Sequence, residues 1–364
     1  MFSAPHYVPV IKLKAGELSA LGEVGDRLRS LPVTPFFDVT PLVEDPDRED
    51  DRPLGEAHVS GVAEDIMDDW GRTDPVFIDA AALDNYSPGH PRAIGEIAEQ
   101  ASNTGFRFVP VTGLRRSREY QRAARWAAEQ QSEGLGLRIT PVDTQSSGLR
   151  KAIDQLLEYT GHAPPEVDFL LDYGAVPAGH HAVYGRDILG LMAELPYIED
   201  WRTMTVAGSA LPSDLSEKMS DNSAEAFDRS AWKMYHHVHQ ARDQIARTPA
   251  FGDYAVTVPS MEKYRVQPAV MRVTPKIKYT AEEQYVVVRG EFQKEDPYGQ
   301  YRDLARRLTE MDIFEHSQTH ADEMIQQYAD GMGATAGGPQ TWVKVGTARH
   351  LEKVGQQIAS IPAP

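Results

Sequence analysis

Charged side chains stand at or just after the ends of several short apolar runs in this chain. These candidates are Lys12, Lys14, Asp38, Asp79, Arg138, Asp172 and Asp253, and Ser209 adds a hydroxyl at a similar place. Carboxylates can act as general bases or bind Mg²⁺ through oxygen, and lysine or arginine can hold an anion such as phosphate. The pattern therefore indicates a site for a small anionic ligand, with Lys12 and Arg138 as its clamps and Asp38, Asp79 or Asp172 as a base or Mg²⁺ ligand.

The same residues also have a purely structural interpretation. Polar side chains at strand ends can cap helices or form ion pairs across the mouth of a barrel, and Lys14 can pair with Glu17 on a helix surface. A slip of one residue in strand register reverses the direction of every side chain in the strand. Both interpretations therefore stay open at this point.

Several familiar catalytic and metal-binding motifs are missing. The sequence has no cysteine, which excludes disulfides, thiolate nucleophiles and cysteine-ligated zinc. Ser209 has no G-x-S-x-G context, no G-x-G-x-x-G follows the first apolar run, and residues 331–338 lack the Gly-Lys-Ser/Thr of a phosphate-binding loop. His236 and His239 share a helix face without an H-E-x-x-H context, which favours a solvated face over a zinc site.

Eight apolar, β-branched runs would position the charged residues. They lie at 8–12, 33–39, 75–79, 107–112, 135–140, 167–173, 203–208 and 251–256, and helical patterns follow most of them. Strands that alternate with helices are typical of a parallel sheet. Eight such units favour a closed (β/α)8 barrel of the TIM type over an open doubly wound sheet, because closure removes the edges. Sites in such barrels form at the C-terminal ends of the strands.

The remainder of the chain predicts an elaboration of the barrel. We assign residues 1–260 to the barrel and 261–364 to a hairpin and helices packed on it, including the last barrel helix. Strands at 270–278 and 284–289 would form the hairpin, and residues 298–311 could be the eighth barrel helix. Residues 320–328 would be another helix and 345–358 a closing helix. Lys278, Arg289 and His350 are candidate ligand contacts if this part covers the mouth, and ordinary exposed charge is the alternative.

Composition limits the kinds of partner. Hydrophobic residues make up 41% of the 364 residues, which is enough for a large core, and the formal net charge is −17. An acidic balance argues against binding of duplex nucleic acid, which depends on local positive charge, and favours weak contact with anionic membranes. We see no secretory leader and no apolar run of membrane-spanning length, so we expect a cytoplasmic protein. The sequence leaves the oligomeric state undetermined.

An ordered series of short segments resembles the "beta protein" family of phages and prokaryotes. The series runs through 7–17 (YVPVIKLKAGE), 77–79 (FID), 110–114 (PVTGL), 137–138 (LR), 171–172 (LD), 207–209 (AGS), 251–254 (FGDY), 277–280 (IKYT), 288–290 (VRG), Trp342 and 345–351 (VGTARHL). The sequence departs from the family pattern in two places. Asp38 stands where a glutamate is usual, which withdraws the carboxylate by about one methylene, and Arg349-His350 replaces a His-His pair.

The resemblance implies a barrel protein associated with phages and bacterial defence regions, and it assigns no catalytic residue. One hypothesis is an enzyme that binds or hydrolyses a nucleotide or another phosphoester at the barrel mouth. A second is a non-catalytic sensor or interaction subunit that recognises a phage or host protein. A third is an inhibitor of a host factor whose acidic loop at 44–51 mimics nucleic acid, although such a run is usually a solvated loop.

Overall fold

The barrel is closed by eight parallel strands in a computed structural model of the chain. The structure describes residues 2–41, 59–71, 74–84, 92–145, 148–259, 274–292, 298–332 and 335–362. The barrel strands are β1 (Tyr7–Lys12), β2 (Phe36–Asp38), β3 (Val76–Asp79), β4 (Phe108–Thr112), β5 (Leu135–Ile139), β6 (Val167–Ala175), β7 (Thr203–Ser209) and β9 (Ala250–Asp253). β1 pairs with both β2 and β9, which closes the sheet. The predicted (β/α)8 fold is confirmed, whereas the acidic loop at 44–51 and the hairpin start at 270–273 lie outside the described residues.

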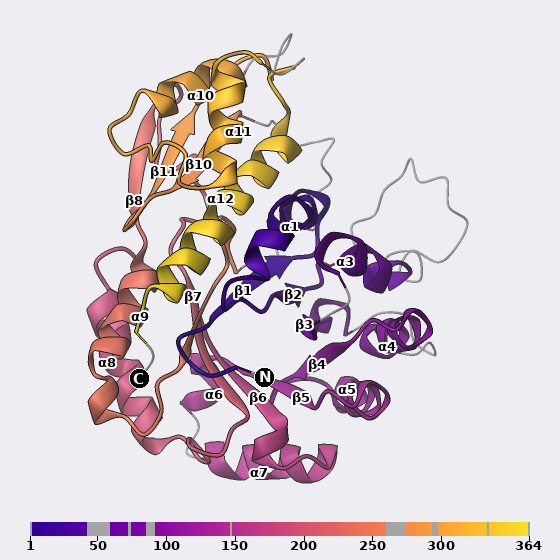
Figure 1. The fold of residues 1–364 in the computed structure, drawn as a ribbon. Coiled ribbons are helices and arrows are strands. Elements are labelled where there is room, and N and C mark those ends of the chain that lie inside the picture. Colours follow the sequence, from indigo (N-terminus) through magenta and orange to yellow (C-terminus); the bar gives the residue numbers. More distant parts are fainter. Residues whose placement is uncertain are drawn as a thin grey trace.

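Amphipathic helices cover the outside of the barrel (Figure 1). The helices of this part are α1 (Ala15–Leu28), α3 (Val62–Trp70), α4 (Ala93–Thr104), α5 (Arg118–Gln131), α6 (Pro141–Thr144), α7 (Leu149–Thr160), α8 (His181–Glu194) and α9 (Ser230–Gln240). α5 shows how the sequence sets a boundary, because the Ser117 side chain accepts the Tyr120 N–H and so caps the first turn. Tyr120, Ala124 and Ala128 then recur at helical spacing and are buried.

Alternation along the strands separates the barrel interior into an apolar part and a charged layer. Val8, Val10, Phe36, Phe77 and Val111 point inward and pack with one another, among other inward-facing residues. Side chains two positions further along a strand point the same way. On five strands this places a charged residue inward near the C-terminal end, and these residues are Lys12, Asp38, Asp79, Arg138 and Asp172.

A second, antiparallel sheet stands beside the barrel, with the order β10–β11–β8. Its strands are β10 (Lys276–Thr280), β11 (Gln284–Arg289) and β8 (Ala224–Asp228). The hairpin of β10 and β11 was predicted from the sequence. β8 was not predicted, because it is a largely exposed edge strand that lacks an apolar run.

The last barrel helix differs from the prediction. α10 (Tyr301–Thr309) packs against α11 (His320–Ala329) and the antiparallel sheet. α12 (Pro339–Ala359) instead contacts α1 and β1, and it also contacts β10. It runs from the small sheet along the side of the barrel (Figure 1). The place expected for 298–311 therefore belongs to α12, and helical spacing alone could not distinguish the two because both have an apolar face.

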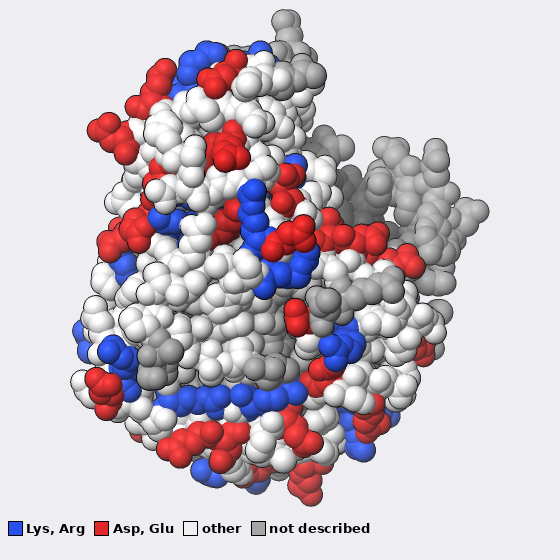
Figure 2. All heavy atoms as spheres, in the orientation of Figure 1, with Lys and Arg blue, Asp and Glu red and all other residues white. Residues whose placement is uncertain are grey.

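The surface carries charges of both signs. On the face drawn in Figure 2, Lys and Arg side chains lie among Asp and Glu side chains, with no broad basic area among the coloured residues. Within the described ranges, no helix combines the length and the apolar character that crossing a membrane requires.

Candidate functional site

The inward-facing charges meet at a cavity of about 520 Å³ at the C-terminal end of the barrel. Its lining comes from the ends of several barrel strands and from the loops that follow them. The charged and aromatic side chains of the lining are Asp38, Asp79, Arg115, Arg116, Arg138, Asp143, Asp172, Tyr173 and Tyr254. Four of the candidates predicted from the sequence therefore line one cavity: Asp38, Asp79, Arg138 and Asp172.

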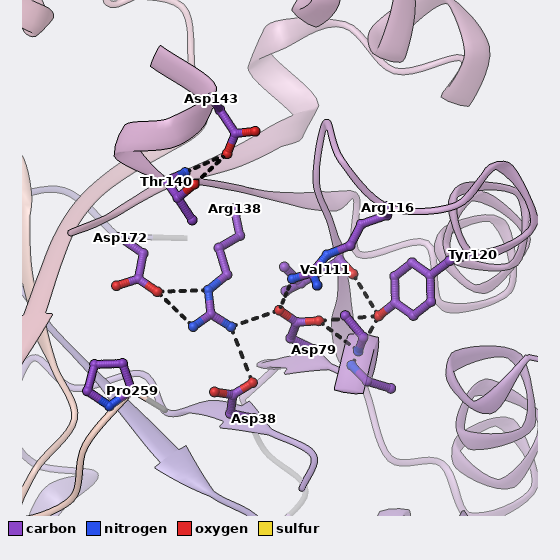
Figure 3. Close-up of polar contacts among 12 residues, drawn as sticks. Asp38, Asp79, Val111, Arg116, Tyr120, Arg138, Thr140, Asp143, Asp172 and Pro259 are labelled. Atoms are coloured by element: carbon purple, nitrogen blue, oxygen red, sulfur yellow. Dashed lines mark hydrogen bonds and ion pairs between the residues drawn. The ribbon is translucent and has the colours of Figure 1, made fainter. Parts of the chain in front are cut away.

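Arg138 is the hub of this site (Figure 3). Its Nη1 donates to Asp79 Oδ2 at 2.8 Å and to Asp38 Oδ1 at 3.2 Å. Its Nε and Nη2 donate to Asp172 Oδ2 at 3.0 and 2.7 Å, and Nη2 also donates to the Tyr254 hydroxyl at 2.6 Å. These five bonds match the five N–H groups of a guanidinium. Arg138 could therefore contact an incoming anion only by giving up one of these bonds.

Asp79 is held in its ionised form. Its Oδ2 accepts from Arg116 Nη2 at 2.9 Å as well as from Arg138, and its Oδ1 accepts the Ala81 N–H at 3.0 Å. Burial alone would raise the pKa of the Asp79 carboxyl, but the charges of Arg116 and Arg138 and these hydrogen bonds outweigh it and lower the pKa. Asp79 is thus a fixed negative charge at the base of the cavity.

Lys12 lies beneath the cavity and is fully buried. Its Nζ donates to Asp38 Oδ2 at 2.6 Å and to the Pro259 carbonyl at 3.3 Å, and it lies 5.2 Å from the centre of the Tyr254 ring. The shorter side chain at position 38 still reaches both Lys12 and Arg138. Lys12 therefore neutralises Asp38 inside the barrel, and it does not belong to the cavity lining.

Arg116 and Tyr254 were missed by sequence reasoning. Arg116 stands in the loop after β4, where no apolar run marks it. The Tyr254 hydroxyl donates to Asp172 Oδ2 at 2.5 Å. Burial, together with the neighbouring carboxylates, raises the pKa of Tyr254 well above its usual value, so it stays protonated. Its signal was strand alternation, because Ala250 and Tyr254 lie four positions apart and both belong to the inward-facing cluster.

Asp253 and His350 form a separate buried pair. Asp253 lies one position before the inward-facing Tyr254, so its side chain points to the outside of the barrel, toward α12. Its Oδ2 lies 2.8 Å from His350 Nε2, and its Oδ1 accepts from the Tyr7 hydroxyl at 2.7 Å. His350 Nδ1 lies 3.0 Å from Thr280 Oγ1, which links the pair to β10. The pair joins the barrel to α12 and the small sheet, away from the cavity.

The remaining predicted residues also lie outside the cavity lining. Ser209 donates to the Thr257 carbonyl at 3.1 Å. Lys278 donates to the Val256 carbonyl at 2.5 Å. Arg289 pairs with Asp221 at 2.9 Å.

Lys14 lies beside Glu17 at the start of α1. Burial lowers the pKa of the Lys14 ammonium, although the nearby Glu17 carboxylate acts in the opposite direction.

A protein cation occupies the place between the aspartates. Among the residues that the structure describes, no group of three or more His, Cys, Asp or Glu side chains is arranged to hold a metal ion. Asp38, Asp79 and Asp172 instead share the Arg138 guanidinium (Figure 3).

His236, on α9, packs edge-on against Trp232 with ring centroids 4.3 Å apart.

Comparison with known proteins identifies the family. The family model described as Beta protein matches residues 7–356, nearly the whole chain, so the chain belongs to the Beta protein family. No curated protein matches the sequence. A solved GH18 chitinase from Pseudoalteromonas aurantia is similar at 8% identity, over 68% of this chain and 93% of the chitinase, with a TM-score of 0.37. At that level of similarity nothing about activity is transferred from the chitinase.

Proposed function

We propose that this member of the Beta protein family binds a small ligand with an anionic group, such as a phosphate, at the mouth of its barrel. The observation that carries the proposal is a cavity of about 520 Å³ whose lining holds Arg115 and Arg116 beside a buried layer in which Arg138 joins three aspartates. Buried ion pairs contribute little net stability compared with apolar packing, because desolvation of both charges is costly. A charged layer at the functional end of a barrel is therefore better explained by a ligand than by folding.

Arg116 is the residue we assign to the anionic group. Its side chain is 29% exposed, whereas that of Arg138 is 11% exposed and that of Lys12 is 0% exposed. Arg116 shares Asp79 Oδ2 with Arg138, so it can turn toward a ligand while Asp79 keeps a cationic partner. Arginine also matches the geometry of phosphate and carboxylate oxygens. Arg115, in the same lining, adds a second positive charge.

The same site could support hydrolysis of a phosphoester. Such a reaction needs a carboxylate that can accept a proton from water. Asp172 is the residue we assign to this role, because it lines the cavity and pairs with one arginine, whereas Asp79 pairs with two. Asp79 is less suited, since its pKa is lowered. In this version Arg116 would hold the phosphate and Asp172 would orient the water.

The alternative function is binding of a protein partner, and the shape of the barrel mouth distinguishes the two hypotheses. A scaffold for a partner needs no hollow above its charged layer, and here a cavity of about 520 Å³ lies there. The large apolar side chains that are exposed among the described residues are Trp126, Val142, Val183, Phe292, Tyr298, Met332 and Val343. Those that lie in helices come from four different helices. The phage and defence setting that we expect for the family directs the ligand search toward nucleotides.

A binding screen tests the proposal. Thermal shift and calorimetry would compare inorganic phosphate, nucleoside mono-, di- and triphosphates and sugar phosphates on the wild type and on Arg116→Gln. A ligand at about 100 times its Kd adds roughly 2.7 kcal/mol of stability. We expect at least one compound to raise the Tm of the wild type and to lose most of that effect in Arg116→Gln.

The matched control is Arg125→Gln on α5, where an exposed arginine pairs with Glu129 at 2.8 Å. This variant should keep the full ligand effect. An equal shift in all three proteins would place the ligand elsewhere, and a screen in which no compound stabilises the wild type would count against the proposal.

A further inference from the structure

The segment at residues 254–259, which follows β9, forms one wall of the cavity. Tyr254 and Pro259, at its two ends, both belong to the cavity lining. The segment is almost entirely buried, although it is neither helix nor strand. Buried backbone groups need hydrogen-bond partners, and in this segment side chains supply many of them.

Two of these side chains come from the barrel. Ser209 Oγ, at the end of β7, donates to the Thr257 carbonyl at 3.1 Å. Lys12 Nζ, at the end of β1, donates to the Pro259 carbonyl at 3.3 Å.

Two others come from the antiparallel sheet. Lys278 Nζ on β10 donates to the Val256 carbonyl at 2.5 Å. The Tyr285 hydroxyl on β11 donates to the Ala255 carbonyl at 3.3 Å. Side chains of the segment also pack on this sheet, because Val256 and Val258 belong to the same buried apolar cluster as Tyr285. The small sheet thus holds the segment by polar and apolar contacts together.

The backbone of the segment is in a conformation that needs such support. Ala255 has a φ of +48°, in the left-handed region that residues other than glycine rarely adopt. A residue held there is under backbone strain and persists where its surroundings over-determine it. The Ala255 N–H donates to Asp253 Oδ1 at 3.0 Å, and the Ala255 carbonyl accepts from Tyr285.

We propose that Lys278 and Tyr285 are positioning residues for the barrel-mouth site, which act through residues 254–259. By fixing this segment they set the place of the Tyr254 hydroxyl, which bonds Asp172 and Arg138, and the place of Pro259 in the wall. The inference rests on the proposed function for the role of the site. It assigns to the antiparallel sheet the task of shaping the cavity.

Three variants test the proposal. Lys278→Met removes the ammonium that holds the Val256 carbonyl, and Tyr285→Phe removes a single hydroxyl and keeps the ring. Lys276→Met is the matched control, because this lysine stands two positions earlier on the same face of β10. Hydrogen exchange of a peptide over 250–259 should become about tenfold faster in the first two variants and stay unchanged in the control.

A double-mutant cycle gives a readout on the site that needs no ligand. If Lys278 positions Tyr254, the Tm loss in Lys278→Met with Tyr254→Phe will be smaller than the sum of the two single losses. The same cycle with Lys276→Met should be additive. A merely structural lysine would give additive losses in both cycles, which would overturn the proposal, as would unchanged exchange in both positioning variants.

Binding of inorganic phosphate, measured by calorimetry, separates the two proposals. If the wild type binds phosphate, we expect a loss of at least threefold in affinity in Lys278→Met and Tyr285→Phe but not in Lys276→Met. Unchanged affinity in both positioning variants would overturn the inference and leave the proposed function standing. If the wild type binds no phosphate, the exchange and cycle results still decide the inference. Tyr285→Phe keeps the test decisive if Lys278→Met fails to fold.

Discussion

Replacing Arg138 with methionine removes the cation that Asp38, Asp79 and Asp172 share, and fills a similar space with apolar atoms. Breaking a buried ion pair by removing one partner costs about 3–5 kcal/mol, because the other partner is left uncompensated. With an unfolding entropy of about 2.1 cal/mol/K per residue, a chain of 364 residues should lose roughly 4–7 °C in Tm. Lys12 and Arg116 still pair with Asp38 and Asp79, so Asp172 loses most.

The loss should depend on pH in a defined direction. In the wild type the pKa of Asp79 is lowered, so its contribution to stability is present above the unfolded value near 3.9 and is lost as pH falls through the folded pKa. Without Arg138, the pKa of the Asp79 carboxyl loses one of the charges that lower it, and burial of the three charged carboxylates opposes folding at neutral pH. The difference in Tm between wild type and variant should therefore be largest near pH 7 and shrink below about pH 4.

Scanning calorimetry from pH 3 to pH 8 measures this difference, and two controls accompany it. Arg125→Met removes an exposed pair on α5, which is worth only about 0.3–0.5 kcal/mol. Millimolar Ca²⁺ should raise the Tm of Arg138→Met more than that of the wild type, since three carboxylates then face one another. An Arg138→Met protein within 1 °C of the wild type at pH 7, or a difference that does not shrink in acid, would refute the assignment of Arg138 as the shared cation.

Three further variants distinguish residues of the cavity from residues that only support the fold. His350→Ala leaves the buried Asp253 carboxylate without its histidine partner, so we expect a loss of about 1–3 kcal/mol in urea unfolding with the ligand effect intact; loss of that effect in a folded variant would connect the pair to the cavity. Tyr254→Phe removes the hydroxyl between Arg138 and Asp172 and should cost about 1–2 kcal/mol; calorimetry showing no change would mean that this hydroxyl is not needed to satisfy Asp172. Ser117→Ala removes the cap of α5, so we expect a loss of about 1 kcal/mol in urea unfolding and no change in ligand affinity. Full stability would show that Asp84, which accepts from the Ser117 N–H and hydroxyl, can replace the cap.

The fold was predictable because most of its strands stand out in the sequence as short apolar runs. Strands of a parallel barrel are buried on both faces, so runs such as 8–11 (VPVI) read as continuous apolar segments. β8 gave no such signal, because an exposed edge strand has no apolar face to show. The exchange of roles between α10 and α12 has a similar cause, since periodicity predicts an apolar stripe and not the surface that the stripe will cover.

The site was predictable in part. The predictions that were right differ from the one that was wrong in the direction that strand alternation gives the side chain. Asp38, Asp79, Arg138 and Asp172 were found because each ends or nearly ends a strand on the inward parity. Asp253 stands one position out of phase and therefore pairs with His350 outside the barrel wall. The inward position there belongs to Tyr254, and the register that decides between the two depends on how β9 pairs with β1 and β7.

The charge balance of the site determines which residues can attract an anionic ligand. Three aspartates in the ion-pair network, Asp38, Asp79 and Asp172, face three cations, Lys12, Arg116 and Arg138, so this layer is close to neutral. A phosphate dianion would therefore gain little from the layer as a whole. Its attraction must come from Arg115, and from Arg116 when that partly exposed side chain turns from Asp79 toward the ligand. Charges near solvent are screened by salt far more than buried ones. Binding through Arg116 should therefore weaken as ionic strength rises, whereas an anion that displaced Asp172 from the buried Arg138 would bind with little salt dependence.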